Sequence, residues 1–323
     1  MANWIVAGGV LLLLLGSEAA IRGGVGLARA FNFSPLVIGV LVIATATSMP
    51  ELFVSLRAAT MGAPGIALGG VVGTSILNIL FVLGLGALIH PMASPPKVVF
   101  RDGGMMLLAS LALIAASFTG VLSRQIGALL LLGLVAYIVL VFITDWRRTP
   151  DHSVPQARAI YRSQGEVPSV FAALFILAVG FILLVLGAHF TVQGSLALAR
   201  HWHLDSTAMG LTVVAAALAL PKLIVTLVAA FRGYTSIAVG QLIGAAVFNI
   251  FGVLGVTALV APLTIPPMLA QTDFIVLAAA SAALLPVLAM RWCLSRPRGF
   301  ILILAYGGYL AFVAFRQGLL PLP

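Results

Sequence analysis

Apolar residues in this chain gather in long, almost uninterrupted blocks, and polar residues are confined to short stretches between them. Each block is long enough to cross a hydrocarbon core about 30 Å thick as a helix. Ten such segments lie near residues 4–24, 34–60, 66–89, 102–120, 124–144, 168–198, 205–231, 236–260, 272–290 and 299–316. A long polar segment, 145–167, separates the first five from the last five. The pattern predicts an all-α integral membrane protein with halves at 1–144 and 168–323, joined by a linker at 145–167.

The amino-acid composition agrees with this fold class and indicates that the chain lies in a lipid bilayer. Of the 323 residues 62% are hydrophobic and only 8% are charged, and the mean hydropathy is +1.20. A soluble domain of this size needs far more polar surface. We therefore expect a multi-pass protein of the cell (inner) membrane.

The basic residues are distributed unevenly between the two sides of the ten-helix arrangement. Of the 17 lysines and arginines, twelve fall in alternate loops on one side and four on the other, while Lys222 lies within a segment. Cytoplasmic loops of membrane proteins carry such an excess of basic residues. This predicts that the 145–167 linker is cytoplasmic and that both termini lie outside. It also explains the net charge of +9 without a nucleic-acid partner.

The two halves of the chain are copies of one another. A shift of 171 residues aligns 12–91 with 183–262 without a gap, and 31 of these 80 positions are identical. The identities include glycine, proline and asparagine positions, which chance similarity between apolar segments would not align. Each copy has five predicted helices, so the second enters the membrane from the opposite side. We expect two inverted repeats related by an axis in the membrane plane, with helices interrupted near Pro50 and Pro221.

Polar side chains within the first repeat cluster around a proline. Buried polar groups are costly in hydrocarbon unless they are paired or line a site. Pro50 also frees a backbone carbonyl one turn earlier, which needs a partner of its own. The first-repeat polar residues at this depth are Thr45, Thr47, Ser48, Glu51, Thr74, Ser75 and Asn78. Oxygen ligands beside a broken helix are suited to a hard cation.

These residues carry a family resemblance. The stretches "TATSMPELFVSL" and "GGVVGTSILNILFVLG" resemble the first alpha repeat of the calcium:cation antiporter superfamily, which includes the sodium/calcium exchangers. The stretch "PKLIVTLVAAFRGYTSIAVGQLIGAAVFNIFGVLG" is similar to the second. The resemblance implies a secondary antiporter for inorganic cations with ten helices and no cofactor beyond the transported ion. It also implies a central site in which two glutamates bind calcium and hydroxyls and amides share sodium.

Position by position, the resemblance gives the first repeat a nearly complete site and the second a depleted one. Gly70 stands where the family usually has asparagine, and Asn249 stands where many exchangers have aspartate. The first-repeat matches are Thr47, Ser48, Glu51, Thr74 and Asn78. In the second repeat the family's oxygen-bearing residues are replaced by Leu218, Ala219, Lys222 and Ala245.

Lys222 decides which functions remain open. If it faces Glu51, a divalent cation meets one carboxylate and one ammonium, and charges about 4 Å apart interact by about 4 kcal/mol at an effective dielectric near 20. Calcium binding at Glu51 is therefore disfavoured. Burial disfavours the ammonium form whereas a nearby carboxylate favours it, so Lys222 could exchange its proton and admit sodium or potassium. Two alternatives stay open: a static Glu51–Lys222 pair in a non-transporting scaffold, and sodium- or calcium-linked exchange with Lys222 turned away.

Three further intramembrane residues are candidates for accessory roles. Glu18 and His189 are repeat mates and could belong to a proton path, and Gln241 lies about two helical turns from Asn249. The sequence contains no His-x-x-x-His, Gly-x-Ser-x-Gly or paired aspartate of the kind that an intramembrane hydrolase needs. We therefore expect a protein that is not an enzyme.

Overall fold

The computed structural model describes residues 2–30, 47–93, 96, 98–146, 169–231, 233 and 235–319. Nine of the ten predicted segments are helical spans long and apolar enough to cross a membrane within these residues. The tenth, 34–60, is described only in its last part, as α4 (Met49–Thr60). Almost all of the 145–167 linker lies outside the described residues.

The helices of the two halves follow one another in corresponding order. The first half contains α1 (Ala2–Ala30), α4, α5 (Pro64–Leu77), α6 (Leu83–Ile89), α7 (Gly104–Ser117) and α8 (Arg124–Trp146). The second contains α10 (Val170–His201), α11 (Ser206–Met209), α12 (Ala215–Phe231), α13 (Thr235–Val247), α14 (Gly255–Val260), α15 (Phe274–Ala289) and α16 (Arg296–Arg316).

Several spans contain a wider, π-helical turn, and short strands tie their ends. The π-helical segments are η2 (Asn78–Val82), η3 (Val98–Gly103), η4 (Gly210–Val214), η5 (Phe248–Leu254) and η6 (Leu269–Asp273), and η7 (Met290–Trp292) is a 3₁₀ turn. The two-residue strands are β1 (Met92–Ala93), β2 (Val121–Leu122), β3 (Leu263–Thr264) and β4 (Cys293–Leu294). β1 pairs antiparallel with β4 and β2 with β3, so each pairing joins the two halves.

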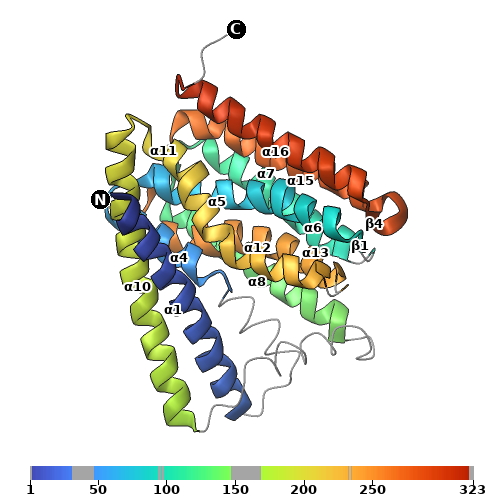
Figure 1. Cartoon of the computed structure of the whole chain (residues 1–323), viewed down its shortest axis with the longest axis horizontal. Coiled ribbons are helices and arrows are strands. Elements are labelled where there is room, and N and C mark those ends of the chain that lie inside the picture. Colours follow the sequence, from blue (N-terminus) through green and yellow to red (C-terminus); the bar gives the residue numbers. More distant parts are fainter. Residues whose placement is uncertain are drawn as a thin grey trace.

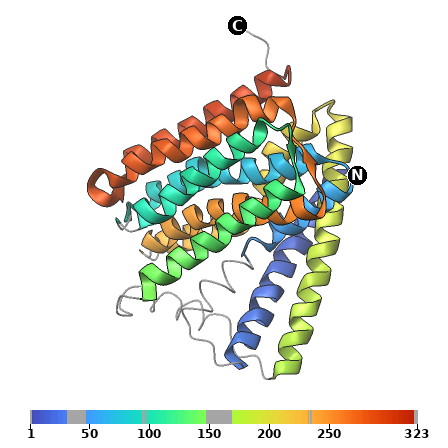
Figure 2. The same ribbon diagram turned by 180° about the vertical axis from the view of Figure 1, so that it is seen from behind.

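The long helices α1 and α10 form a pair beside the other spans (Figures 1 and 2). They run antiparallel, and glycines at seven-residue intervals bring their backbones into contact. A Cβ at Gly9 would lie 2.6 Å from the backbone nitrogen of Thr191, and one at Gly16 would lie 2.8 Å from that of Leu184. Small residues allow this approach between helices in lipid, where close packing replaces the hydrophobic effect.

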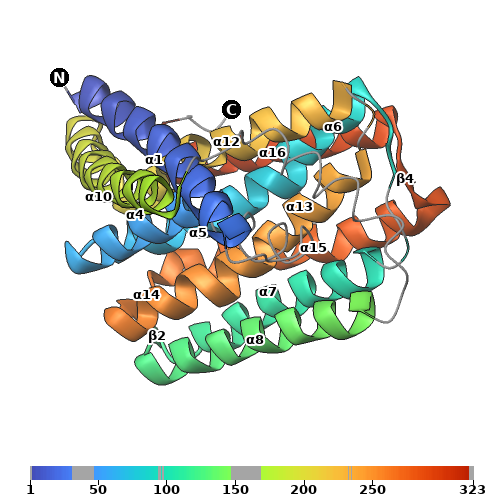
Figure 3. The same ribbon diagram turned by 90° about the horizontal axis from the view of Figure 1, so that it is seen from below.

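The core of the protein is the span formed by α5, η2 and α6. Every residue from Gly65 to Leu77 is buried, although the segment is scarcely amphipathic, because other helices surround it on all sides. Helices α7 and α8 lie along the edge away from α1 and α10 (Figure 3), and many α8 side chains are exposed. Close approach again depends on glycine: a Cβ at Gly73 would lie 2.6 Å from the carbonyl oxygen of Leu211.

Repeat mates meet across the interface between the halves. Ser110 Oγ on α7 lies 3.2 Å from Ser281 Oγ on α15, and these residues are 171 positions apart. The antiparallel α1–α10 contact joins another pair of corresponding helices. Mates touch each other only where a pseudo-two-fold axis passes between them, and antiparallel mates place that axis across the helices. The two halves are therefore related by a pseudo-two-fold rotation that gives them inverted topologies, as the odd number of helices in each predicts.

The predicted interruption at Pro221 is wrong. Helix α12 runs through Pro221 from Ala215 to Phe231. A proline removes one backbone donor, and a helix within a packed bundle tolerates that loss. The irregular turn lies earlier, at η4. In the first half, α4 begins at Met49 with Pro50 in its first turn, where the missing N–H has no intrahelical acceptor to lose.

Candidate functional site

Glu51 lies at the start of α4 and is completely buried. It occupies the first turn of the helix, and its exposed fraction is 0%. The preceding Ser48 is the N-cap residue, yet its side chain makes no capping hydrogen bond. Backbone N–H groups at a helix N-terminus favour a negative charge. The local fold therefore holds Glu51 where a carboxylate is stabilised by the helix itself.

Lys222 on α12 is the repeat mate of Glu51 and is its partner in the structure. Its exposed fraction is 1%, and its Nζ donates a hydrogen bond to Glu51 Oε1. The ion pair thus lies on the pseudo-two-fold axis, with a negative charge from one half and a positive charge from the other. Glu51 Oε2 has no hydrogen-bond partner among the described residues. One carboxylate oxygen is therefore neutralised and the other is still open to a ligand.

Asn78 and Asn249 supply the amide groups of the site. Asn78 begins η2, and Asn249 is the second residue of η5, so both stand in widened turns. Such turns are frequent at functional sites. Both residues are fully buried, and neither the oxygen nor the nitrogen of either amide has a hydrogen-bond partner among the described residues. Helix α4 packs against η5, and α12 packs against η2, so each asparagine belongs to a segment that contacts the helix of Glu51 or of Lys222.

The hydroxyl groups divide into free and occupied ones. Ser48 Oγ and Thr226 Oγ1 are buried and lack a partner within the described part of the chain. Thr74 Oγ1, by contrast, donates to the carbonyl oxygen of Gly70 at 2.7 Å. Thr47 is half-buried beside Ser48. Buried polar atoms are almost always hydrogen-bonded in folded proteins, so these open atoms, together with the open oxygen of Glu51, make up a candidate site for a ligand with positive charge.

The Lys222 side of the site is filled with hydrocarbon. A Cβ at Gly70 would lie 3.8 Å from Leu218 Cδ1 and 3.3 Å from Val214 Cγ1, so Leu218 packs against the surface that an asparagine would otherwise occupy. In the 171-residue register Gly70 corresponds to Gln241 and Leu218 to Thr47. The contact of Gly70 with Leu218 is thus apolar, whereas the corresponding positions in the other half, Gln241 and Thr47, are both polar. Gln241 itself is partly exposed.

The accessory candidates Glu18 and His189 contact different partners and are not brought together. Glu18 Oε1 accepts a hydrogen bond from Arg22 Nε at 2.8 Å, and both side chains are about half exposed. His189 Nδ1 lies 2.8 Å from Arg57 Nη2. No contact among the described residues links these two pairs into a single proton path.

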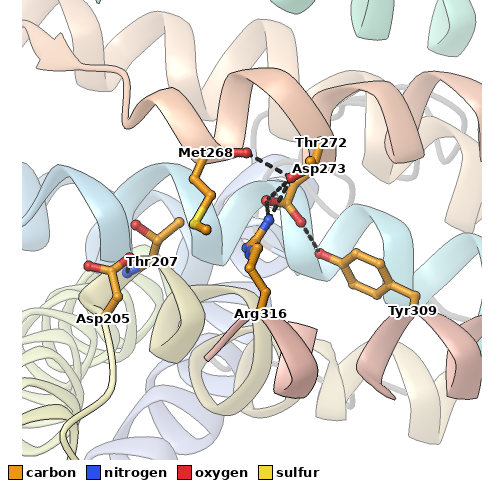
Figure 4. Close-up of polar contacts among 7 residues, drawn as sticks. All are labelled: Asp205, Thr207, Met268, Thr272, Asp273, Tyr309 and Arg316. Carbon is orange, nitrogen blue, oxygen red and sulfur yellow. Dashed lines mark hydrogen bonds and ion pairs between the residues drawn. The ribbon is translucent and has the colours of Figure 1, made fainter. Parts of the chain in front are cut away.

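Sequence reasoning missed two buried aspartates, Asp102 and Asp273. Asp273 is fully buried and accepts hydrogen bonds from Tyr309 Oη at 2.9 Å and Arg316 Nη1 at 2.9 Å (Figure 4). Asp102 pairs with Arg101 Nε at 2.6 Å. The two aspartates are 171 residues apart, and the repeat register extended past residue 91 would have found them. Both carboxylates have arginine partners, so we assign them to the packing of their helices.

An inverted repeat whose polar centre lies at the interface of the halves is the architecture of secondary transporters. The family described as "Sodium/calcium exchanger protein" matches residues 1–143 and 172–315. The chain belongs to this family. It is thus a multi-pass membrane protein of a cation antiporter family, and the predicted fold class of ten helices in two inverted repeats is confirmed.

Individual relatives agree in length as well as in family. A putative antiporter, CaxA of Alkalimonas amylolytica, is 32% identical over 96% of this chain and 97% of its own length. The inner membrane protein YrbG of Escherichia coli is 31% identical over 100% and 98%. The sodium/calcium exchanger MaX1 of Methanosarcina acetivorans is 29% identical over 95% and 97%. A solved structure of the sodium-calcium exchanger NCX_Mj, soaked with Na⁺ and Sr²⁺, has a TM-score of 0.63 with 28% identity, covering 98% of this chain and 97% of that one.

Proposed function

We propose that this protein is a proton-coupled antiporter for a monovalent cation, sodium or potassium, in which Lys222 carries the exchanged proton. The observation that supports this proposal is the ion pair itself. A buried ammonium neutralises one oxygen of Glu51, while its other oxygen and the two asparagine amides are buried without partners among the residues that the structure describes. The site has the oxygen ligands of a cation site and a tethered cation already beside them.

The charge of the site determines which ion it accepts. With Glu51 and Lys222 both ionised the pair is neutral, and a calcium ion entering it would raise the local charge to +2. A family glutamate in place of Lys222 would instead attract the ion, and each such charge contact is worth about 4 kcal/mol at about 4 Å and an effective dielectric near 20. Replacing attraction by repulsion therefore lowers calcium affinity by several orders of magnitude.

Exchange follows when the ammonium loses its proton. Lys222 then becomes a neutral amine and releases one H⁺, which leaves the carboxylate of Glu51 as the single charge of the pair. A monovalent cation bound by Glu51 Oε2 and the amide oxygens of Asn78 and Asn249 restores neutrality. Each cycle moves one cation against one proton, and the site has the same charge in both loaded states. We therefore infer that the exchange is electroneutral.

The depleted side of the site limits the number of ions. Leu218 packs on Gly70, and Ala219 and Ala245 offer no oxygen atoms. The candidate ligands with open atoms are the carboxylate of Glu51, the amides of Asn78 and Asn249, and the hydroxyls of Ser48 and Thr226, and they include a single carboxylate. One monovalent ion at a time satisfies this ligand set, whereas separate sodium and calcium positions would need the oxygens that the second repeat lacks.

Sodium- or calcium-linked exchange is the second candidate, because the names of MaX1 and NCX_Mj describe sodium/calcium exchangers. It requires Lys222 to leave Glu51. As part of the same proposal, we place the protein in the cell (inner) membrane with both termini outside and the 145–167 linker cytoplasmic. The domain division at that linker, with halves 1–144 and 168–323, is likewise a proposal.

Transport in liposomes tests these candidates. Purified protein is reconstituted with a pH-sensitive dye inside, and sodium, potassium or calcium is added outside. We expect sodium or potassium to drive proton efflux at a rate that does not change when the membrane potential is clamped. Glu51→Gln should abolish the efflux, and Lys222→Met should uncouple cation movement from pH. Calcium-driven sodium movement without any proton flux would refute the proposal, and an inert parent protein would favour a scaffold.

A further inference from the structure

A groove on the outside of the bundle has features that the ion site does not explain. It lies between α4, α10 and α14 and has a volume of about 270 Å³. Its walls are mostly apolar and include Phe53, Leu56, Val185 and Val260. The exposed fractions of Val185 and Val260 are 52% and 54%, so the groove is open along its length. An apolar groove on a membrane-spanning surface faces acyl chains.

Arg57 brings a positive charge into this groove. Its Nε and Nη2 lie 3.1 and 2.8 Å from His189 Nδ1. An arginine only donates hydrogen bonds, so Nδ1 of His189 accepts, and the imidazole is neutral with its proton on Nε2. The pair thus carries one unit of positive charge. No carboxylate of the described residues forms an ion pair with Arg57.

The repeat shows that this charge is not required by the packing of the helices. In the 171-residue register Arg57 corresponds to Val228, and His189 corresponds to Glu18. Glu18 is neutralised by Arg22 on its own helix. Among the described residues, the positions that correspond to Arg57 and His189 therefore carry no uncompensated cation. Arg57 adds a positive charge that has no ion-pair partner within the described part of the chain, and an anion in the groove would neutralise it.

We propose that this groove binds an anionic phospholipid, with the phosphate on Arg57 and an acyl chain along Phe53, Val185 and Val260. Arg57 lies in the last turn of α4, which ends at Thr60, so a phosphate on its guanidinium would lie at the end of this helix and the acyl chain would run along its side. A guanidinium fork matches a phosphate in two parallel hydrogen bonds. His189 holds the guanidinium in place from the other side. The proposal does not depend on which ions the central site exchanges.

Thermal-shift titration of the full-length protein in detergent tests the proposal. The probes are phosphatidylglycerol, phosphatidylcholine and inorganic phosphate, and the variants are Arg57→Gln, Val185→Trp and Arg124→Gln. Arg124→Gln is the matched control, because it removes an exposed arginine at the start of α8, outside the groove. We expect phosphatidylglycerol to stabilise the parent and the control with the same affinity. Its affinity should fall at least tenfold in Arg57→Gln and in Val185→Trp, which fills the groove but keeps the charge.

Three outcomes would overturn the proposal. Equal stabilisation by phosphatidylcholine would show that the lipid's net charge is not recognised. Equal stabilisation by inorganic phosphate would show that the anion, and not a lipid, is the ligand. Undiminished binding of phosphatidylglycerol to either groove variant would place the lipid elsewhere. If Arg57→Gln fails to fold, Val185→Trp still decides the result, since its side chain faces outward and its substitution leaves Arg57 unchanged.

Discussion

Removing one member of the Glu51–Lys222 pair should destabilise the protein far more than removing both. The exposed fractions of the two side chains are 0% and 1%, so each would leave the other as a buried, uncompensated charge. Breaking such a pair costs about 3–5 kcal/mol, whereas replacing both members by uncharged residues of similar volume is often close to neutral. We expect Lys222→Met and Glu51→Gln each to lower the free energy of unfolding by about 3–5 kcal/mol.

The double variant Glu51→Gln/Lys222→Met makes the prediction sharp. Additive effects would predict a loss of about 6–10 kcal/mol, but the coupled pair predicts a loss near zero, so the interaction energy is about 6 kcal/mol or more. Reversible unfolding in mixed micelles, followed by tryptophan fluorescence, measures all four proteins of the cycle. The pair Glu18–Arg22 offers a matched cycle, Glu18→Gln and Arg22→Met. Its side chains are about half exposed, and its coupling should be below about 1 kcal/mol.

A double variant as unstable as the sum of the single variants would refute this reasoning. It would mean that Glu51 and Lys222 are each stabilised by other groups and do not neutralise one another. A stable Lys222→Met variant would show that Glu51 takes up a proton or a cation at no cost when its partner is removed. Repeating the measurement in sodium, potassium and choline salts distinguishes uptake of a metal cation by Glu51 from uptake of a proton.

Other substitutions test separate features. Lys222→Glu should restore the family's second carboxylate and create calcium binding that the parent lacks, measured by calorimetry; the same heat of calcium binding in both proteins would contradict the charge argument. Gly16→Leu should cost about 1–3 kcal/mol by forcing α1 from α10, whereas Gly8→Leu, with nothing within 4 Å of its Cβ, should unfold like the parent. Arg316→Met should lower stability by about 3–5 kcal/mol in the same unfolding assay because it leaves the buried carboxylate of Asp273 without its arginine partner. Adding Asp273→Asn to this variant should recover most of the loss. A cysteine introduced as Ser153→Cys, after Cys293→Ser, should resist an impermeant thiol reagent in intact cells; rapid labelling would place the linker outside.

The architecture follows closely from the sequence because lipid imposes strict rules on it. A helix satisfies its own backbone hydrogen bonds in hydrocarbon, so the length of each apolar block fixes its span. The repeat register fixes more: mates such as Ser110 and Ser281 meet where a two-fold axis must pass. The contact of Glu51 with Lys222 was expected on the same ground. These long-range contacts between repeat mates were predictable because the internal repeat is visible in the sequence and implies a two-fold axis.

Details that depend on packing were not predictable in the same way. The widened turns at Asn78 and Asn249 have no local sequence signal, because π-helical turns arise from how neighbouring helices fit. Helix α12 continues through Pro221 for a similar reason, since surrounding helices hold it in place. The contact of Leu218 with the surface of Gly70 depends on how α5 and α12 pack, which the sequence does not reveal. The partners of Asp273 lie about 36 and 43 residues away on α16, and hydropathy says nothing about such pairs.

The position of the ion pair on the pseudo-two-fold axis has a consequence for the transport cycle. In a transporter made of two inverted repeats, each half can adopt the shape of the other, and that exchange turns an outward-open protein into an inward-open one. With identical centres the two forms would be energetic mirror images. Here the carboxylate always belongs to one half and the ammonium to the other, so the exchange of shapes does not exchange the charges. The two faces of the membrane therefore present different chemical environments to the same ion, and its apparent affinity should differ according to the side from which it is measured.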